Sequence, residues 1–255
     1  MTLSRRDFLK VSAGALIVPA LMPKTLFAEG HKIPVLLYHD ISDQFQDEYT
    51  ISPSRFAAQM ERLYAHDYRA ISLKDLDSLP GESLSRAVVI TFDDGYASFI
   101  DYAFPLLKDY GFKATVNIIG EYVGTFLHLG GNRPMLSWDE YRVLNNSGLV
   151  DLGCHTHNLH GMSKVFQSQK ALEDDFKLFT ETFTKEIGTK PDILAWPFGT
   201  YDQSSVKVAE RMGFKYFLTS REALFRKNGN FNEIPRLNIN NALDLVSFCQ
   251  YIGES

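Results

Sequence analysis

The 255-residue sequence has few cysteines, no excess of basic charge and no long apolar run. Its two cysteines, Cys154 and Cys249, are too few for a disulfide scaffold, and the sequence leaves open whether they pair with each other. The apolar run at 11–22 is too short for a transmembrane helix, so we expect no stable membrane span in the mature chain. No internal repeat, low-complexity tract or interdomain linker is recognisable, which favours a single domain.

Basic residues are scarce outside the N-terminus. Residues 1–28 hold four of the 26 lysines and arginines but only one of the 31 aspartates and glutamates. Residues 29–255 therefore keep 22 basic and 30 acidic side chains, a net charge of −8. Nucleic acid is excluded as an expected partner because binding it requires a basic surface.

The N-terminal residues have the pattern of an export signal. Arg5 and Arg6 precede the apolar run, and Ala28 offers a small residue for cleavage. This order predicts a twin-arginine signal peptide at 1–28, recognised by the twin-arginine export machinery, and a periplasmic or secreted mature chain. A chance arginine pair before a buried helix is the alternative. The mature chain at 29–255 is long enough to bury one large core.

Strand-like apolar runs alternate with helical patterns along the mature chain, as is typical of a parallel α/β sheet or barrel. Ser52-Pro53 and the pair Ser137 and Glu140 predict two helix starts. The predicted strands lie at residues 35–38, 69–73, 87–92, 114–119, 150–154, 193–196, 216–219 and 236–239.

Two adjacent aspartates, Asp93 and Asp94, directly follow the predicted strand at 87–92. Carboxylates so close favour a division of labour, in which one binds a metal while the other accepts a proton from a metal-bound water. A solvated Asp-Asp-Gly turn is the alternative. Because sites assemble where parallel strands end, residues at several strand ends are expected to converge on one mouth.

Three histidines, His155, His157 and His160, follow the predicted strand at 150–154. Asp94 with two of them would give three protein ligands and an open position, the arrangement of a catalytic zinc site. The same donors suit iron, cobalt or nickel. The sequence therefore predicts a divalent-metal site with zinc as the first choice.

These motifs resemble those of the polysaccharide deacetylases, the NodB-like family of carbohydrate esterases. Residues 91–95 read Thr-Phe-Asp-Asp-Gly and match the first family motif at every position. His155-Thr156 followed by His160 is similar to the second motif, and the five-residue spacing resembles the branch that acts on poly-β-1,6-N-acetylglucosamine. The third motif, Arg-x-Pro-Tyr-Gly, appears at 195–199 without its arginine and tyrosine.

The resemblance extends over residues 33–248 and implies a distorted (β/α) barrel of about seven parallel strands, in one domain at 29–255. It implies a general base at Asp93 and a neighbouring histidine, His157, that lines or supports the site. The implied metal ligands are Asp94, His155 and His160.

In the same branch the motif order resembles a circular permutation, with the strand end that carries the general acid at the N-terminus. Residues 36–39, Leu-Leu-Tyr-His, resemble that strand end, and no histidine follows residue 248. The resemblance therefore implies that His39 protonates the leaving nitrogen. A histidine that caps a strand is the alternative.

The residues of the altered third motif have separate expected roles. The resemblance implies that a main-chain N–H near Phe198, next to Pro197, binds the oxyanion, and this role does not need the tyrosine hydroxyl. Trp196 either stacks on a sugar or packs in the core. The arginine absent at Ala195 orients the catalytic aspartate in much of the family. Arg236 is a candidate replacement, and a surface ion pair is an equal alternative.

The function that this resemblance implies is metal-dependent removal of N-acetyl groups from an N-acetylglucosamine-containing polysaccharide, releasing acetate and a free amine. One alternative is hydrolysis of O-acetyl esters or small cyclic amides on the same fold. A second is a non-catalytic glycan-binding module, against which the intact aspartates and histidines argue.

Overall fold

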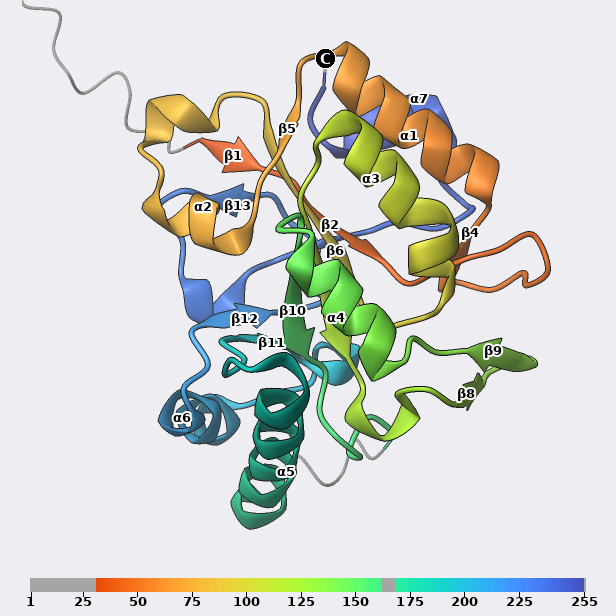
Figure 1. Cartoon of the computed structure of the whole chain (residues 1–255). Coiled ribbons are helices and arrows are strands. Elements are labelled where there is room, and N and C mark those ends of the chain that lie inside the picture. The colour runs from red at the N-terminus through yellow and green to blue at the C-terminus, as the bar shows by residue number, and fades with distance from the viewer. Residues whose placement is uncertain (1–30, 162–167, 255) are drawn as a thin grey trace, which may run out of the picture. The chain divides into compact units, whose positions relative to one another are not determined.

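A computed structural model describes residues 31–161 and 168–254, which form a single compact α/β unit (Figure 1). The predicted signal peptide at 1–28 lies outside the described residues. Within the described part of the chain, no helix is long and apolar enough to cross a membrane.

A curled parallel sheet forms the centre of this unit. Seven strands follow one another in the order β12-β11-β10-β7-β6-β2-β14, and β5 (Arg69–Ala70) pairs alongside β6. The prediction of a distorted barrel of about seven parallel strands is confirmed. The strands of the path are β2 (Val35–Tyr38), β6 (Ala87–Phe92), β7 (Ala114–Ile118), β10 (Val150–Cys154), β11 (Ile193–Ala195), β12 (Tyr216–Leu218) and β14 (Leu237–Asn238).

The two edges of the sheet approach each other through the segment at 234–238. Ile234 forms a parallel bridge to Leu218 of β12, whereas Leu237 pairs with Leu36 of β2. The same short segment therefore contacts both edge strands, and a residue between these two pairs can point into the barrel.

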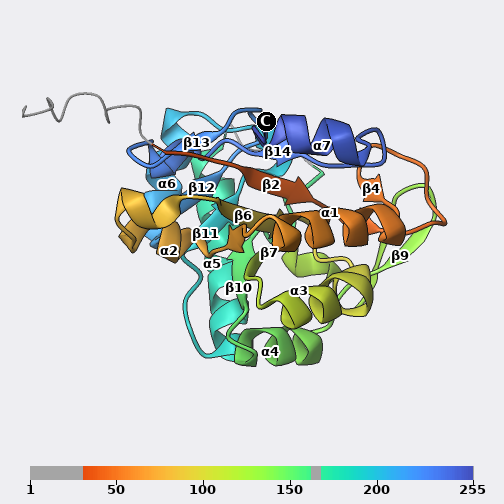
Figure 2. The ribbon, with the colours of Figure 1, turned by 90° about the horizontal axis from the view of Figure 1, so that it is seen from above.

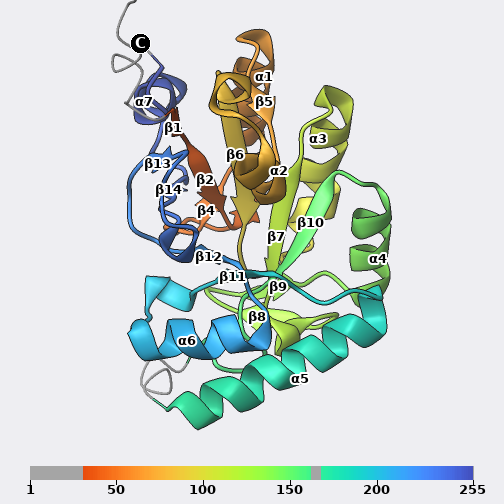
Figure 3. The same ribbon diagram turned by 90° about the vertical axis from the view of Figure 1, so that its left-hand side faces the viewer.

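The described residues form seven α-helices. Figures 2 and 3 show them arranged around the strands. α7 and α3 pack against α1, and α4 and α6 pack against α5. Both predicted helix starts are confirmed, since the side chain of Ser52 caps α1, and Ser137 with Glu140 forms a capping box at α4. The helices are α1 (Pro53–Ala65), α2 (Leu73–Ser78), α3 (Phe104–Tyr110), α4 (Trp138–Asn146), α5 (Gln169–Ile187), α6 (Gln203–Met212) and α7 (Leu245–Tyr251).

Side chains of β6 alternate between two buried layers, as the pleat of a strand requires. Val88, Ile90 and Phe92 belong to the core under the helices, whereas Ala87 and Val89 belong to the second core cluster. Thr91 and Asp93 continue the second row toward the carboxyl end of the strand. The strand therefore turns polar where the site begins.

Three short pairings were not predicted: β1 (Lys32–Ile33) with β13 (Phe225–Arg226), β3 (Asp40–Ile41) with β4 (Thr50–Ile51), and the hairpin β8 (Phe126–His128) with β9 (Asn132–Pro134).

The predicted strand at 69–73 was too long. It ends at Ala70 because Ser72 caps α2 together with Asp75. The two cysteines are free thiols, Cys154 in the buried β10 and Cys249 in α7, so the bridge that the sequence left open is not formed.

Candidate active site

The carboxyl ends of the parallel strands meet at a cavity of about 470 Å³. Its lining comes from segments that lie up to about 200 residues apart along the chain, as expected where parallel strands end together. The predicted site residues that line it are His39, Asp93, Asp94, His155, His160, Trp196, Phe198 and Arg236.

Asp94, His155 and His160 form a cluster with the donor atoms for a metal ion, all within 4.8 Å of one another. The Oδ1 atom of Asp94 lies 3.5 Å from Nε2 of His155 and 3.3 Å from Nε2 of His160. This oxygen is buried and has no hydrogen-bond partner among the described residues, which a bound cation would correct. One carboxylate and two imidazoles fit zinc and leave a position open.

A second contact fixes the orientation of His155. Its Nδ1 lies 2.8 Å from the carbonyl oxygen of Ala195. Because a carbonyl only accepts, Nδ1 carries the proton and Nε2 keeps its lone pair toward Asp94, as in other metal-binding histidines. Ala195 thus contributes to the site through its main-chain carbonyl, which accepts the hydrogen bond of His155.

The electrostatics keep Asp94 and His155 in the forms that bind a metal. Burial opposes ionisation of Asp94, but the neighbouring His160 and His39 outweigh it and lower the pKa of Asp94 to about 2. Burial lowers the pKa of His155 to about 4. At neutral pH the carboxylate is therefore ionised and this imidazole is neutral, which are the states that metal binding requires.

Asp93 has different neighbours. Its two oxygens accept hydrogen bonds from the two terminal nitrogens of Arg236, each at 2.7 Å, and Oδ1 also accepts from Nδ2 of Asn117 at 2.8 Å. Burial would raise the pKa of Asp93, but Arg236 and His155 hold it well below its usual range. Asp93 is thus a fixed, ionised carboxylate beside the cluster of metal-ligand donors.

Arg236 lies inside the barrel, with 1% of its surface exposed. It belongs to the segment that contacts both edge strands, and it also donates to the Thr219 carbonyl at 2.9 Å and to Oγ1 of Thr91 at 3.2 Å. The alternative of a surface ion pair is therefore excluded. Arg236 thus binds Asp93 from a part of the chain that is distant from Ala195 in the sequence.

His39 follows β2 at the edge of the cavity. Its ring contacts the ring of Tyr49 edge-on at 5.1 Å between centroids. Its Nδ1 is buried and has no hydrogen-bond partner among the described residues. The imidazole therefore lies in the same cavity as both aspartates, with a nitrogen that no described residue engages.

The third motif forms a short turn, Pro197–Gly199. Phe198 takes a left-handed conformation with φ 55° and is 57% exposed, and its ring lies 5.1 Å from the ring of His160. Residues other than glycine rarely adopt this conformation, which concentrates at functional sites. Pro197 is buried at the start of the turn.

Of the two roles left open for Trp196, its burial agrees with packing in the core and not with stacking on a sugar. Its side chain has no exposed surface and packs against the rings of Tyr201 and Phe217, with nearly parallel planes. A fully buried ring offers no face to a substrate. Trp196 therefore belongs to the core, the alternative that the sequence had left open.

His157 does not join the metal cluster and does not line the cavity. Its main-chain N–H donates to Oδ2 of Asp175, and its ring packs so closely on Gly120 that a Cβ there would lie 2.2 Å from Nδ1. His157 therefore supports the loop that carries His155 and His160.

Two buried polar residues near the site were missed from the sequence. Asn117 is an amide within the otherwise apolar end of β7, and Asp175 is a carboxylate on the buried face of α5. A polar side chain in an apolar pattern is the signal that would have identified both, because burying such a group is costly and most buried polar groups are held by hydrogen bonds.

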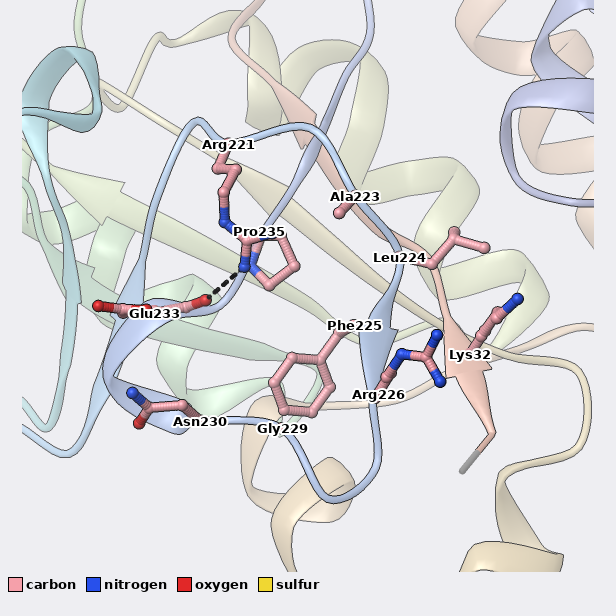
Figure 4. A pocket seen from close by; sticks show the side chains of 10 residues that line it. All are labelled: Lys32, Arg221, Ala223, Leu224, Phe225, Arg226, Gly229, Asn230, Glu233 and Pro235. Atoms are coloured by element: carbon pink, nitrogen blue, oxygen red, sulfur yellow. Dashed lines mark hydrogen bonds between the residues drawn. The ribbon is translucent and has the colours of Figure 1, made fainter. Parts of the chain in front are cut away.

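A second cavity, of about 420 Å³, lies over β13 and contains none of the predicted site residues (Figure 4). Arg221 donates there to the carbonyl of Glu233 at 3.5 Å. This pocket has neither the paired carboxylates nor a histidine, so it is not the candidate active site. Its lining includes Lys32, Arg221, Arg226, Asn230 and Glu233.

Comparisons with known proteins agree with the motifs. Residues 81–217 match the family model of polysaccharide deacetylases. Poly-β-1,6-N-acetyl-D-glucosamine N-deacetylase of Staphylococcus aureus strain MSSA476 is 30% identical over 214 residues, covering 79% of this chain and 71% of that protein. The protein of the same name from Staphylococcus epidermidis is 29% identical over 202 residues, covering 76% and 69%.

The solved structure of IcaB from Ammonifex degensii superposes with a TM-score of 0.76 at 26% identity, covering 89% of this chain and 97% of that one. The family match includes more than half of the chain, and it contains the paired aspartates, the two cluster histidines and the turn of the third motif. The chain therefore belongs to the polysaccharide deacetylase family.

Proposed function

We propose that this chain is a metal-dependent hydrolase that removes N-acetyl groups from an N-acetylglucosamine-containing polysaccharide. One observation carries the proposal: an Asp-His-His cluster with the geometry of a metal site lies beside a second buried carboxylate that is held by an arginine. A non-catalytic glycan-binding module would not need this arrangement.

Asp94, His155 and His160 would hold a divalent metal, with zinc as the first choice and cobalt, nickel or iron as alternatives. When bound, the metal supplies Lewis-acid chemistry that polarises a water molecule and the acetyl carbonyl. The oriented Nε2 of His155 and the ionised carboxylate of Asp94 provide two donors that are already in the state that binds a cation.

The remaining steps belong to the chain's own residues. Asp93 accepts a proton from the attacking water as the new C–O bond forms, and Arg236 and Asn117 keep this carboxylate ionised and in place. The main-chain N–H near Phe198 stabilises the negative charge on the acetyl oxygen. As the C–N bond breaks, His39 gives its proton to the sugar nitrogen, so that acetate and a free amine leave.

The substrate class is proposed from the two staphylococcal relatives, whose names specify poly-β-1,6-N-acetyl-D-glucosamine. The cavity volume of about 470 Å³ is within the range of ligand pockets. Tyr49, Tyr122 and Leu129 line its wall and provide the apolar and aromatic surface on which sugar rings pack. Such a polymer would be met outside the cytoplasm, in agreement with the proposed signal peptide at 1–28.

Acetate release by the purified protein tests the proposal. We expect release from β-1,6-linked N-acetylglucosamine oligomers, loss of this activity after chelation, and recovery when zinc is added back. Acetylated xylan is the comparison substrate, because faster release from it would favour the O-acetyl esterase alternative. Absence of acetate from both substrates in the metal-loaded protein would refute the catalytic assignment.

A further inference from the structure

The loop between the two ligand histidines turns sharply without a glycine. Thr156 takes the left-handed conformation there, with φ 68°, which β-branched residues rarely adopt. A strained residue of this kind persists only where its surroundings hold it. The loop that sets the positions of His155 and His160 therefore depends on anchors outside itself.

The carboxylate of Asp175 is such an anchor. Its Oδ2 accepts the N–H of His157 and its Oδ1 accepts the N–H of Asn158, each at 2.8 Å. The residue is 4% exposed. Burial raises the pKa of Asp175, and the N–H groups of Asn158 and His157 are the main opposing influence. The loop thus supplies the polar partners that permit this carboxylate to be buried.

The position of Asp175 on α5 makes its identity informative. Leu172, Phe176, Phe179 and Phe183 form the buried apolar stripe of this helix, and Asp175 interrupts it. An apolar residue would pack there without the cost of burying a charge. A carboxylate at this place is therefore explained by the loop that it binds rather than by the packing of the helix.

The opposite side of the loop is held by the turn after β7. The N–H of Gly120 donates to the Thr156 carbonyl at 3.1 Å, and the N–H of Glu121 donates to the His157 carbonyl at 2.8 Å. The loop is thus fixed from two sides, by a carboxylate that binds its N–H groups and by N–H groups that bind its carbonyls.

We propose that Asp175 is a positioning residue for the metal ligands, which holds the strained turn so that His155 and His160 reach Asp94 together across their five-residue spacing. The proposal rests on the metal site of the proposed function. It adds that metal affinity is set in part by a side chain that contacts neither the metal nor a ligand side chain.

The test compares Asp175→Asn with Asp174→Asn in the full-length protein. Asp174 is the neighbouring acid on the same helix, but its side chain is 59% exposed and pairs with Lys170. Zinc affinity is measured by competition with a chromophoric chelator, and the geometry of the ligands by the absorption spectrum of the cobalt form. Circular dichroism of the metal-free proteins checks the fold.

We expect Asp175→Asn to bind zinc about 10- to 100-fold more weakly and to change the cobalt spectrum, as is usual when support of a metal ligand is lost. Asp174→Asn should match the parent in both measurements. Parental zinc affinity and an unchanged spectrum in a folded Asp175→Asn would overturn the proposal while leaving the proposed function intact. A parent protein that binds no zinc would reject both.

Hydrogen exchange in the metal-free parent protein tests the proposal even if Asp175→Asn does not fold. The amides of His157 and Asn158 should exchange slowly, because Asp175 accepts both of their hydrogens. Exchange at the rates of an unprotected chain would show that the anchor does not hold the loop in solution.

Discussion

At the residue scale, the paired aspartates show how surroundings rather than sequence neighbours divide chemical roles. Asp93 receives three hydrogen bonds, two from Arg236 and one from Asn117, so its oxygens have little capacity left for a metal. Asp94 has a buried oxygen with no hydrogen bond among the described residues and imidazole nitrogens beside it. Two identical side chains are therefore prepared for two different tasks.

The division of labour predicts different losses. Asp94→Asn should lose metal and activity together, because an amide oxygen is a weaker ligand than a carboxylate. Asp93→Asn should keep its metal and lose most turnover, by about 10² to 10⁴ if the proton transfer is lost. Metal content by mass spectrometry and acetate release are the measurements. Equal depletion of metal in the two folded variants would contradict the assignment.

A second prediction concerns His39 as the general acid. His39→Ala should reduce amide cleavage by about 10² to 10⁴ while the metal content stays parental, because an amine anion is a very poor leaving group. Nitrophenyl acetate is the control substrate, since its phenolate leaves readily and its hydrolysis should change much less. If the variant deacetylates the N-acetyl glycan at the parental rate, His39 is structural. His157 would be a poor substitute because it does not line the cavity.

At the scale of elements, neighbouring strands fix one another's polar groups. Asn117 of β7 lies beside Gly153 of β10, and these two residues are register partners in the parallel pair. A Cβ on Gly153 would lie 2.3 Å from Oδ1 of Asn117 and 3.0 Å from Ile193 of β11. The absence of a side chain at one strand position thus makes room for the amide that holds Asp93.

Gly153→Ala is therefore predicted to act on both stability and the site. Overpacking between strands costs about 1–3 kcal/mol, and displacement of Asn117 should reduce turnover further. Urea unfolding measures the first effect and acetate release the second. Gly161→Ala serves as the control for stability, because a Cβ there meets no atom of the described residues within 4 Å. Equal unfolding midpoints for the two variants would argue against the close packing.

At the scale of the whole molecule, the site joins the two edges of the curled sheet. Arg236 comes from the segment that pairs with β12 on one side and with β2 on the other, and it binds Asp93 at the end of β6. The proposed ligand Asp94 follows the same strand, β6, and His155 follows β10. A metal ion bound by these ligands would therefore link distant parts of the chain and should stabilise the complete fold.

Metal binding is predicted to raise the melting temperature, because the unfolded chain cannot offer the same three ligands together. Free zinc at 100 times its dissociation constant would add about 2.7 kcal/mol, or several degrees for a protein of this size. A chelator should reverse the shift, and Asp94→Asn should not respond. A melting temperature independent of zinc in the parent protein would speak against the site.

The proposed export route gives a separate prediction for the intact precursor. Replacement of Arg5 and Arg6 by lysine should leave the precursor in the cytoplasm, because the twin-arginine machinery reads the arginine pair. Cell fractionation with an antibody to the protein is the measurement. Normal appearance of the double variant outside the cytoplasm would reject this route while leaving the catalytic assignment untouched.

The sequence by itself determined the elements and the kind of chemistry. Alternation of strand and helix patterns predicted a parallel α/β sheet or barrel, and local signals such as Ser137 with Glu140 placed helix starts correctly, because these signals act within one turn. The adjacent Asp93 and Asp94 follow one strand and the histidines follow another, and these two local motifs predicted a metal site because parallel strands end at the same side of a barrel. Features that depend on residues close together in the sequence could therefore be predicted from it.

Only the tertiary structure decided which distant groups meet. Nothing local to Arg236 shows that it lies inside the barrel against Asp93, 143 positions away, rather than in a surface ion pair. The same is true of Trp196, whose ring is as compatible with a sugar as with a core until its neighbours are known. Burial and hydrogen-bond partners arise from packing between elements, and packing is a property of the closed sheet rather than of any segment of it.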